Sequence, residues 1–427
     1  MLTTMVTTSD QALGFGKEVM GGGGAMPLKV QDREALASRL NELSASDGPN
    51  VIELSAGTYN FSGTAVTQRE FTIRARRLTI RAEEGKRVVL KNLQLKLDLE
   101  RADDILIQDL AFYSDGTGPE DAILLDGTKG SKDSTSRVRI THCSFDGYKD
   151  IAIDSHSHET ALLATIDRCL FFDSRPGDPC DPLRRDGKRM VRPFVDRGAI
   201  NISSVVDESR PVKKGEELPR TQGNSLVTVA FNVFVNVWRR CPRVAFPGNF
   251  GDIFNNLVYH WGAGNGENDK SNGTDTWNGM SVGNQGAAVI QANRFIPGLV
   301  PDGTSTTKTV LRTDKTVQLD IDPDPIVDIG KGSFTNQFDN GAMAPNGTFT
   351  NLSSDRMQLY STVQLGQPPT VTPTADLAIK TKGTPNLFTW ADIVTNAGPR
   401  GTEGTEVTPE KTSRNLVRVA LGVPTAQ

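Results

Sequence analysis

The sequence lacks the features that mark several large classes of protein. No apolar run approaches the ~20 residues that span a bilayer, and the start, MLTTMVTTSDQALGFG, has neither the basic nor the apolar part of a secretion signal. Either the chain is cytosolic or such a signal has been removed from it. Because the formal net charge is only −4, no whole-molecule field would gather nucleic acid or an anionic membrane. We expect neither as a partner.

Cysteine is scarce as well. Four cysteines are too few for a disulfide scaffold, and no Cys-x-x-Cys pair indicates a zinc site. Cys143 and Cys169 occur in matching strand contexts, so we interpret them as small core residues. Cys180 and Cys241 fall in predicted loops, and a bridge between them would require an oxidising compartment.

Familiar catalytic motifs are also absent. The sequence has no Ser-His-acid signature and no His-Glu-x-x-His pair, and no Lys-Ser/Thr follows the glycines at 21–24. The four histidines show no metal-ligand spacing, and we expect His156 and His158 to lie in a loop. Serine hydrolases, zinc proteases and P-loop nucleotidases therefore receive no support.

What the sequence does contain is a short repeated motif in a glycine- and proline-rich background, with 41 Gly and 23 Pro. In each copy an aliphatic residue stands five positions before a Phe, with a small or polar residue between them. The copies end at Phe112, Phe145, Phe171, Phe234 and Phe295. Spacings of 26 residues (143 to 169) and 24 residues (232 to 256) recur. A period of this length is typical of a solenoid.

The repeat predicts an all-β fold, a right-handed parallel β-helix with long loops. Each unit is too short to bury its own apolar face, so the units must stack at a spacing of ~4.8 Å. Stacking would align the five Phe side chains inside the coil. A second ladder, of small and polar residues, is expected at a corner: Asp109, Cys143, Cys169, Asn232, Asn256 and Asn293. An antiparallel β-sandwich, the alternative, would not need the same residues at the same phase.

Two regions are expected along the chain. Residues 1–300 would form the β-helix, capped near the N-terminus by an amphipathic helix over Val30–Leu43. After about Pro301 the repeat fades into a segment rich in Thr, Pro, Gly and Asp. We predict that 301–427 wraps around and packs on the β-helix rather than forming its own domain, with a short helix around Leu387–Val394.

Three acids point to a metal site. Asp121 opens one predicted rung, and Asp150 and Asp154 lie four residues apart on the next. Residues of even separation share a face of a strand. Carboxylates on adjacent rungs repel each other unless a hard cation lies among them, and calcium accepts six to eight oxygens. The alternative is that these acids are solvated at turn edges.

A basic turn follows at Arg240-Cys241-Pro242-Arg243, between two predicted strands in 227–261. Proline presets the backbone, so the turn should be stiff, and a rigid pair of guanidiniums suits an anion. Alternatively, these arginines pair with surface acids. A run of basic residues in the 176–195 insertion is either a solvated loop or the rim of a cleft for a polyanion.

Over roughly residues 13–300 the sequence resembles the pectate lyase superfamily, polysaccharide lyase family 1. GFG at 14–16 followed by GGGG is similar to the family's opening, and ADDILIQDLAF is similar to its first long rung. DAILLDG and VRITHCSFDGYKDIAID are similar to its calcium-binding rungs. The most specific match is NVWRRCPRV with FNNLVYHW, which is similar to the family's Arg-x-Pro-Arg-Val segment and the asparagine rung that follows it.

The resemblance implies specific roles for six residues. Asp121, Asp150 and Asp154 would be the ligands of Ca²⁺, the cofactor. Arg240 would be the catalytic base, and Arg197 and Arg243 would bind substrate.

The sequence also departs from the family's pattern. The family's substrate-binding lysine is matched by Arg197, or less well by Arg175, and its second substrate arginine falls on Ala245. A further acidic position that some members use for calcium falls on Pro119. The insertion at 176–195 is unusual. These departures concern affinity and substrate preference more than fold.

The implied activity is calcium-dependent β-elimination in polygalacturonate or another acidic pectic polysaccharide, which gives unsaturated oligogalacturonides. The protein would be a secreted monomer. One alternative is a calcium-independent pectin lyase that acts on methylated pectin, and another is a non-catalytic glycan-binding protein or adhesin. A hydrolase on the same fold is disfavoured, because no paired-acid Gly-His-Gly site is visible.

Overall fold

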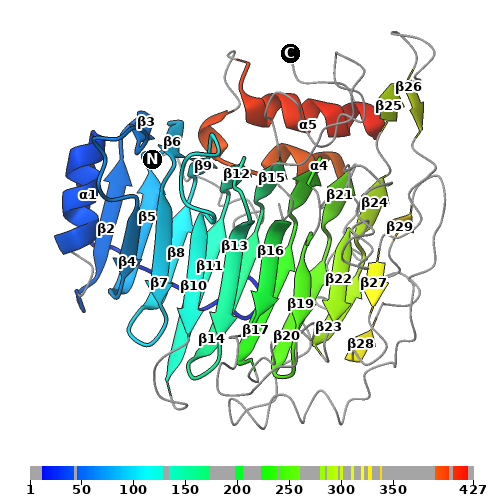
Figure 1. The fold of residues 1–427 in the computed structure, drawn as a ribbon, viewed down its shortest axis with the longest axis horizontal. Helices are drawn as coiled ribbons and strands as arrows, with labels where there is room; N and C mark the ends of the chain where they lie inside the picture. The colour runs from blue at the N-terminus through cyan, green and yellow to red at the C-terminus, as the bar shows by residue number, and fades with distance from the viewer. Residues whose placement is uncertain are drawn as a thin grey trace, which may run out of the picture.

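The computed structural model describes residues 12–42, 46–127, 134–172, 198–204, 223–237, 240–259, 279–283, 286–296, 390–402 and 407–421. It also describes the backbone of five short strands between 299 and 338. Three parallel sheets run along the described chain. In Figure 1 the coil advances across the page, from the blue helix at one end to the yellow strands at the other. The predicted right-handed parallel β-helix is confirmed.

Each turn of the coil adds one strand to each sheet. Sheet A contains β1 (Pro27–Val30), β2 (Asn50–Leu54), β5 (Arg76–Ala82), β8 (Asp103–Gln108), β11 (Thr135–Thr141), β14 (Ala161–Asp167), β17 (Ser225–Ala230), β20 (Asn249–Phe254), β23 (Ala287–Gln291) and β28 (Ile326–Asp328). Sheet B contains β3 (Gly57–Asn60), β6 (Val88–Lys91), β9 (Ala111–Tyr113), β12 (Ser144–Asp146), β15 (Leu170–Phe172), β18 (Val233–Val235), β21 (Leu257–Tyr259), β24 (Arg294–Ile296) and β29 (Gln337–Phe338).

Sheet C forms the third side of the coil. It contains β4 (Glu70–Ile73), β7 (Gln94–Asp98), β10 (Ile123–Gly127), β13 (Ile151–Ser157), β16 (Gly198–Ser203), β19 (Arg243–Ala245), β22 (Met280–Gly283) and β27 (Leu319–Ile321). A separate antiparallel pair joins β25 (Leu299–Pro301) to β26 (Thr309–Leu311). Side chains alternate between the interior and the outer face of each strand.

The predicted aromatic stack fills the interior beside sheet B. The rings of Phe112, Phe145, Phe171 and Phe234 are parallel within 12°, and successive centroids lie 4.9–5.2 Å apart. Phe295 lies on the same ladder but does not extend the stack, because Val258 pairs with both Phe234 and Phe295. The prediction is therefore right for four rings and wrong for the fifth.

A polar ladder closes the corner between sheets A and B. The Oδ1 atom of Asn256 accepts hydrogen bonds from the backbone N–H and Nδ2 of Asn232, both at 3.0 Å, and the Oδ1 of Asn293 accepts from the backbone N–H of Asn256 at 2.9 Å. Cys143 and Cys169 precede the aligned strands β12 and β15, and both thiols are buried. This part of the predicted ladder is confirmed.

Asp109 does not belong to that ladder, and its predicted place was wrong by one residue. Ala111 pairs with Ser144, so Leu110 is the residue aligned with Cys143. Asp109 instead adopts a left-handed conformation, with φ of 58°. His142 and Arg168 do the same at the equivalent corner positions. The carboxylate of Asp109 binds the guanidinium of Arg400 at 2.9 and 2.5 Å.

Helices cover one end and one side of the coil. Helix α1 (Arg33–Glu42) lies within the predicted range, and it buries Leu36 and Leu40 at the first rungs. Helices α4 (Trp390–Asn396) and α5 (Pro409–Ala420) lie over the outer face of sheet B (Figure 1). Val394 and Val417 pack there with side chains of β15, β18 and β21. Within the described residues, no helix combines the length and apolar character needed to cross a bilayer.

The segment 12–26 forms turns and lies tightly on the outer face of sheet A. The backbone N–H of Gly16 donates to Thr165 and that of Gly22 donates to Thr79, each at 2.9 Å. A side chain at Gly22 would place its Cβ 2.1 Å from the carbonyl oxygen of Asn50. Glycine is therefore required by the close approach of two backbones. The outer faces of sheets A and B are thus partly covered by other segments of the chain.

Candidate functional site

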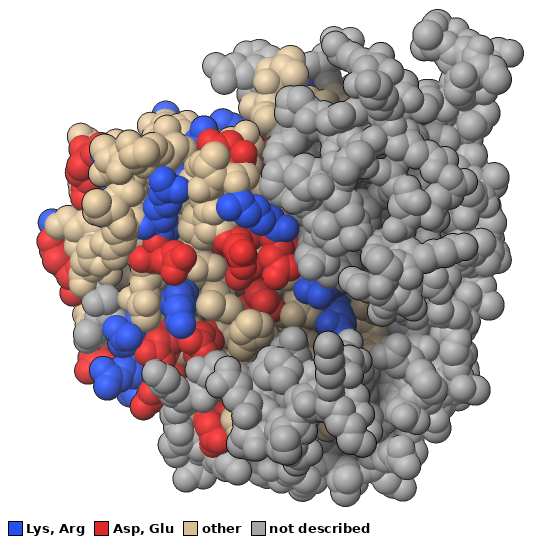
Figure 2. Space-filling view, viewed as in Figure 1, with Lys and Arg blue, Asp and Glu red and all other residues tan. Residues whose placement is uncertain are grey.

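The outer face of sheet C carries a row of aligned residues across neighbouring strands, and all but one of them are polar. The register of β7, β10, β13, β16, β19 and β22 aligns Lys96, Leu124, Asp154, Asn201, Arg243 and Ser281. Their neighbours in sequence, such as Ile153, Ile200 and Val244, belong to the core. Figure 2 shows acidic side chains gathered near the middle of the described front face, with basic side chains beside them.

The three predicted metal ligands lie on two adjacent rungs of this face. Asp121 comes just before β10, Asp150 comes just before β13, and Asp154 is within β13. The backbone N–H of Ile151 donates to Asp121 Oδ1 at 3.1 Å, so the Asp121 carboxylate lies against the start of β13. Burial, followed by the negative charges of Asp154 and Asp150, raises the pKa of Asp121 to about 7. The three acids therefore form a region of excess negative charge.

Asp154 is held in its ionised form by its neighbours. Burial acts to raise its pKa, but His156, Asn201 and the charge of Arg240 together hold that pKa below the usual value. His156 Nε2 lies 3.0 Å from Asp154 Oδ2, and Asn201 Nδ2 donates to Asp154 Oδ1 at 2.8 Å. His156 is thus a strand residue in β13, and its predicted loop position was wrong. The prediction failed because a polar side chain on the outer face of a strand looks, in the sequence alone, like a loop residue.

Arg240 lies on the same face as these acids. Its backbone is left-handed, with φ of 59°, and its carbonyl accepts from the backbone N–H of Ile200 at 2.9 Å. The guanidinium Nη1 lies 3.9 Å from Asp150 Oδ1. The Arg240 side chain is 16% exposed and that of Asp150 is 40% exposed. The structure therefore brings one predicted cation next to the predicted acids, two strands along sheet C.

Gly198 provides the space in which Arg240 lies. A side chain at Gly198 would place its Cβ 3.0 Å from Arg240 Cβ and 2.8 Å from Ile151 Cδ1. The backbone N–H of Gly198 donates to the carbonyl of Asp150 at 2.7 Å. Arg197, directly before it, lies outside the described residues, as do Arg175, Cys180 and the insertion at 176–195.

Arg243 lies in the same row as Asp154, two strands farther along sheet C. It opposes Asn201 on β16 and Ser281 on β22, and its guanidinium carbon lies 5.9 Å from the ring centroid of Phe246. Ala245, where the family has an arginine, is fully buried. Arg243 therefore follows Asp154 and Asn201 in a single line across three strands.

The donor atoms fit a hard cation, although they are not gathered around one point. Within the described ranges, no group of three or more His, Cys, Asp and Glu side chains has metal-site geometry. Asp154 instead contacts His156 and Asn201, while Asp150 faces Arg240. Carboxylate and amide oxygens are the kinds of atom that calcium takes as ligands, and burial, more than the charges of Asp154 and Asp150, raises the pKa of Asp121.

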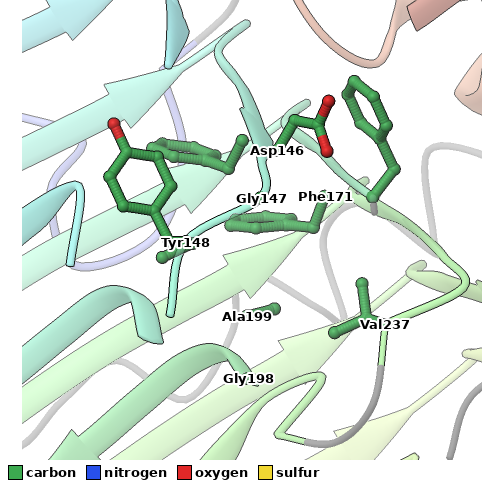
Figure 3. Close-up of a pocket in the computed structure, with 10 residues that line it drawn as sticks. Asp146, Gly147, Tyr148, Phe171, Gly198, Ala199 and Val237 are labelled. Carbon is green, nitrogen blue, oxygen red and sulfur yellow. The ribbon is translucent and has the colours of Figure 1, made fainter. Parts of the chain in front are cut away.

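A small cavity lies behind this face. Figure 3 shows Asp146, Tyr148, Phe171, Gly198 and Val237 around it. Its volume of about 30 Å³ has room for one or two water molecules. A sugar ring does not fit, so a polymer substrate would lie on the open face of sheet C.

Comparison with known proteins finds solved structures with a similar fold. No protein-family profile and no curated protein sequence matches this chain. Among solved structures, the cedar pollen allergen Jun a 1 has a TM-score of 0.52 at 15% identity, over 92% of this chain and 93% of the allergen. The likeness is one of fold.

Two bacterial structures are similar as well. A pectate lyase from Paenibacillus sp. 0602 has a TM-score of 0.48 at 16% identity, over 81% of this chain and 90% of its own. A pectate lyase from Bacillus sp. N165, in complex with trigalacturonate, has a TM-score of 0.48 at 14% identity, over 80% of this chain and 94% of its own.

Proposed function

We propose that this protein is a calcium-dependent pectate lyase that cleaves polygalacturonate by β-elimination. The observation that carries the proposal is the gathering of Asp121, Asp150 and Asp154 on one face with Arg240, whose Nη1 lies 3.9 Å from Asp150 Oδ1. The pectate lyase neighbours support the reaction class, and the trigalacturonate complex of one of them supports an acidic polysaccharide as substrate. The protein would act outside the cell as a monomer.

Asp121, Asp150 and Asp154 would hold the calcium ion. Bound there, calcium would neutralise the uronate carboxylate and stabilise the negative charge that develops as the C5 proton leaves. The three acids fix this position on the outer face of sheet C. Arg243, two strands farther along the same row, would bind a neighbouring uronate carboxylate, and Arg197 would serve the same purpose.

Arg240 would take the proton from C5. The electron pair of that bond then forms the C4–C5 double bond, the C4–O4 bond breaks, and O4 takes up a proton. Arginine normally keeps its proton to above pH 12, so a neutral Arg240 is rare near pH 7. We therefore expect an alkaline optimum.

The proposal is tested with polygalacturonate and with methylated pectin, each in calcium and in chelator. The unsaturated product is followed by its ultraviolet absorbance. The wild type should release it from polygalacturonate in calcium alone, and Arg240→Ala should not. Activity on pectin that survives excess chelator would select a calcium-independent pectin lyase instead. Binding of either polymer without any product would select a glycan-binding protein. A rate independent of pH between about 7 and 10 would reject Arg240 as the base.

A further inference from the structure

Asn201 has a buried oxygen that no group in the protein satisfies. Its side chain lies on the outer face of β16, and the residue is only 5% exposed. Nδ2 donates to Asp154 Oδ1 at 2.8 Å, whereas Oδ1 has no hydrogen-bond partner. An ionised carboxylate accepts hydrogen bonds and donates none. The amide nitrogen must therefore face Asp154, and the unsatisfied end of the amide is the oxygen.

An unsatisfied buried carbonyl is uncommon in proteins. At the corner between sheets A and B, the same residue type is fully used: the Oδ1 atoms of Asn232, Asn256 and Asn293 all accept backbone N–H groups of the neighbouring rung. The fold can therefore satisfy a buried amide oxygen, and at Asn201 it does not. A group from outside the protein is the natural partner.

The surroundings indicate what that group is. Asn201 touches Asp154, one of three acids that lie on two adjacent rungs of this face. Oxygen atoms of carboxylates and amides together make up calcium sites, which take six to eight oxygens. An amide adds a ligand without adding a fourth negative charge to the cation-free cluster. Asn201 also lies on the Arg243 side of Asp154 in the row across sheet C.

We propose that Asn201 Oδ1 is a fourth protein ligand of the calcium ion held by Asp121, Asp150 and Asp154. This inference rests on the proposed function, and it adds a position to the site that the sequence resemblance does not supply. With this ligand, the site would extend from β13 to β16, the strand next to β19, which Arg240 precedes.

The test is calorimetric titration of calcium into the metal-free protein, together with thermal unfolding in calcium and in chelator. Asn201→Leu removes both amide atoms and should weaken calcium binding by about 10- to 100-fold. Asn201→Asp keeps an oxygen ligand but loses the donor to Asp154. It should bind calcium at least as tightly as the wild type and show a larger calcium-induced rise in melting temperature. Ser281→Asp, which adds the same charge two strands away on the same row, is the control, and its calcium affinity should change by about twofold or less.

Three results would overturn the inference. If Asn201→Leu and Asn201→Asp weaken calcium binding equally, Asn201 acts only as the donor that positions Asp154. If Asn201→Leu binds calcium as the wild type does, Asn201 is not a ligand, and the lyase assignment stands unharmed. A wild-type protein that binds no calcium would overturn both this inference and the calcium dependence of the proposed function.

Discussion

The corner between sheets A and B and the outer face of sheet C treat buried polar groups in opposite ways. At the corner, each asparagine of the ladder 232, 256 and 293 both donates and accepts within the protein. On sheet C, Asn201 keeps an unsatisfied oxygen and Asp121 has a pKa raised to about 7. The corner is built for stability, whereas the face of sheet C gives up stability where a ligand would bind.

The outer faces of sheets B and C differ in the same sense. Helices α4 and α5 bury an apolar surface on sheet B, where Phe172 and Val235 contact them in one cluster. Sheet C instead carries ion pairs in line with the site, Arg74 with Asp98 at 2.8 Å and Lys96 with Asp126 at 2.6 Å. One outer side of the coil is therefore apolar and covered by helices, whereas the other carries charged side chains.

The largest expected effect is on activity. Arg240→Ala should lower the rate of polygalacturonate cleavage by about 10²- to 10⁴-fold, because it removes the proton acceptor. The melting temperature should change little, since the Arg240–Asp150 contact is long and Asp150 is 40% exposed. Circular dichroism of both proteins provides the control. A variant with wild-type activity would remove Arg240 from the mechanism.

A matched pair of asparagine variants sharpens the comparison. Asn256→Leu should lower the free energy of unfolding by about 3 kcal/mol or more, because several buried groups lose their partners. Asn201→Leu should cost about 1 kcal/mol or less in calcium-free buffer, because it removes one hydrogen bond and one unsatisfied oxygen. Chemical denaturation measures both. Equal losses would contradict the distinction between corner and face.

The next effect depends on pH and on Asp121. Because its pKa is raised from 3.8 in the unfolded chain to about 7 in the folded protein, its protonated form favours folding. That contribution is complete below pH 3.8 and is lost as the pH rises through about 7. In chelator, the wild type should therefore lose roughly 1–3 kcal/mol relative to Asp121→Asn across this range.

Calcium provides the control for this experiment. The wild type should regain the lost stability at pH 8 when calcium is added, and Asp121→Asn should regain less. The expectation would be contradicted if the stability difference between the two proteins were the same at pH 4 and pH 8 without calcium.

The smallest expected effect is at the corner occupied by Asp109. Asp109→Asn removes the charge that binds Arg400, while asparagine tolerates the left-handed conformation that this position requires. Because the Arg400 side chain is 45% exposed, the cost should be about 1 kcal/mol or less. Denaturant midpoints of the two proteins measure it. A loss of several kcal/mol would show that this pair anchors the C-terminal segment more strongly than its exposure suggests.

The sequence was sufficient for the fold because rung-to-rung stacking repeats the same residues at one phase. Phe112, Phe145, Phe171 and Phe234 were predicted together for that reason. The fifth ring was misplaced because the rung that contains Val258 has no Phe at that phase, as the sequence itself shows. Asp109 was miscounted by one position, because a left-handed corner residue breaks the alternation of the strands on either side.

Helix α5 was not predicted, although its start is visible in the sequence. Thr408 caps it by accepting a hydrogen bond from the Lys411 backbone N–H at 3.1 Å, and Pro409 follows in the first helical position. These signals stand in a region rich in Thr and Pro, a composition that is more typical of loops. Asn201 differs in kind. Its importance depends on a contact with Asp154, 47 residues away in sequence, and on the absence of a second contact, which a sequence pattern does not encode.

The most direct test of the central claim is the mass of the oligosaccharides that the wild type releases from polygalacturonate in calcium. Elimination on the face of sheet C predicts a double bond at each new non-reducing end, so the fragment that carries that end is lighter by one water molecule than the corresponding hydrolysis product, while the other fragment has the same mass. Exclusively saturated products, or no cleavage of any polyuronate in the presence of calcium, would contradict the account.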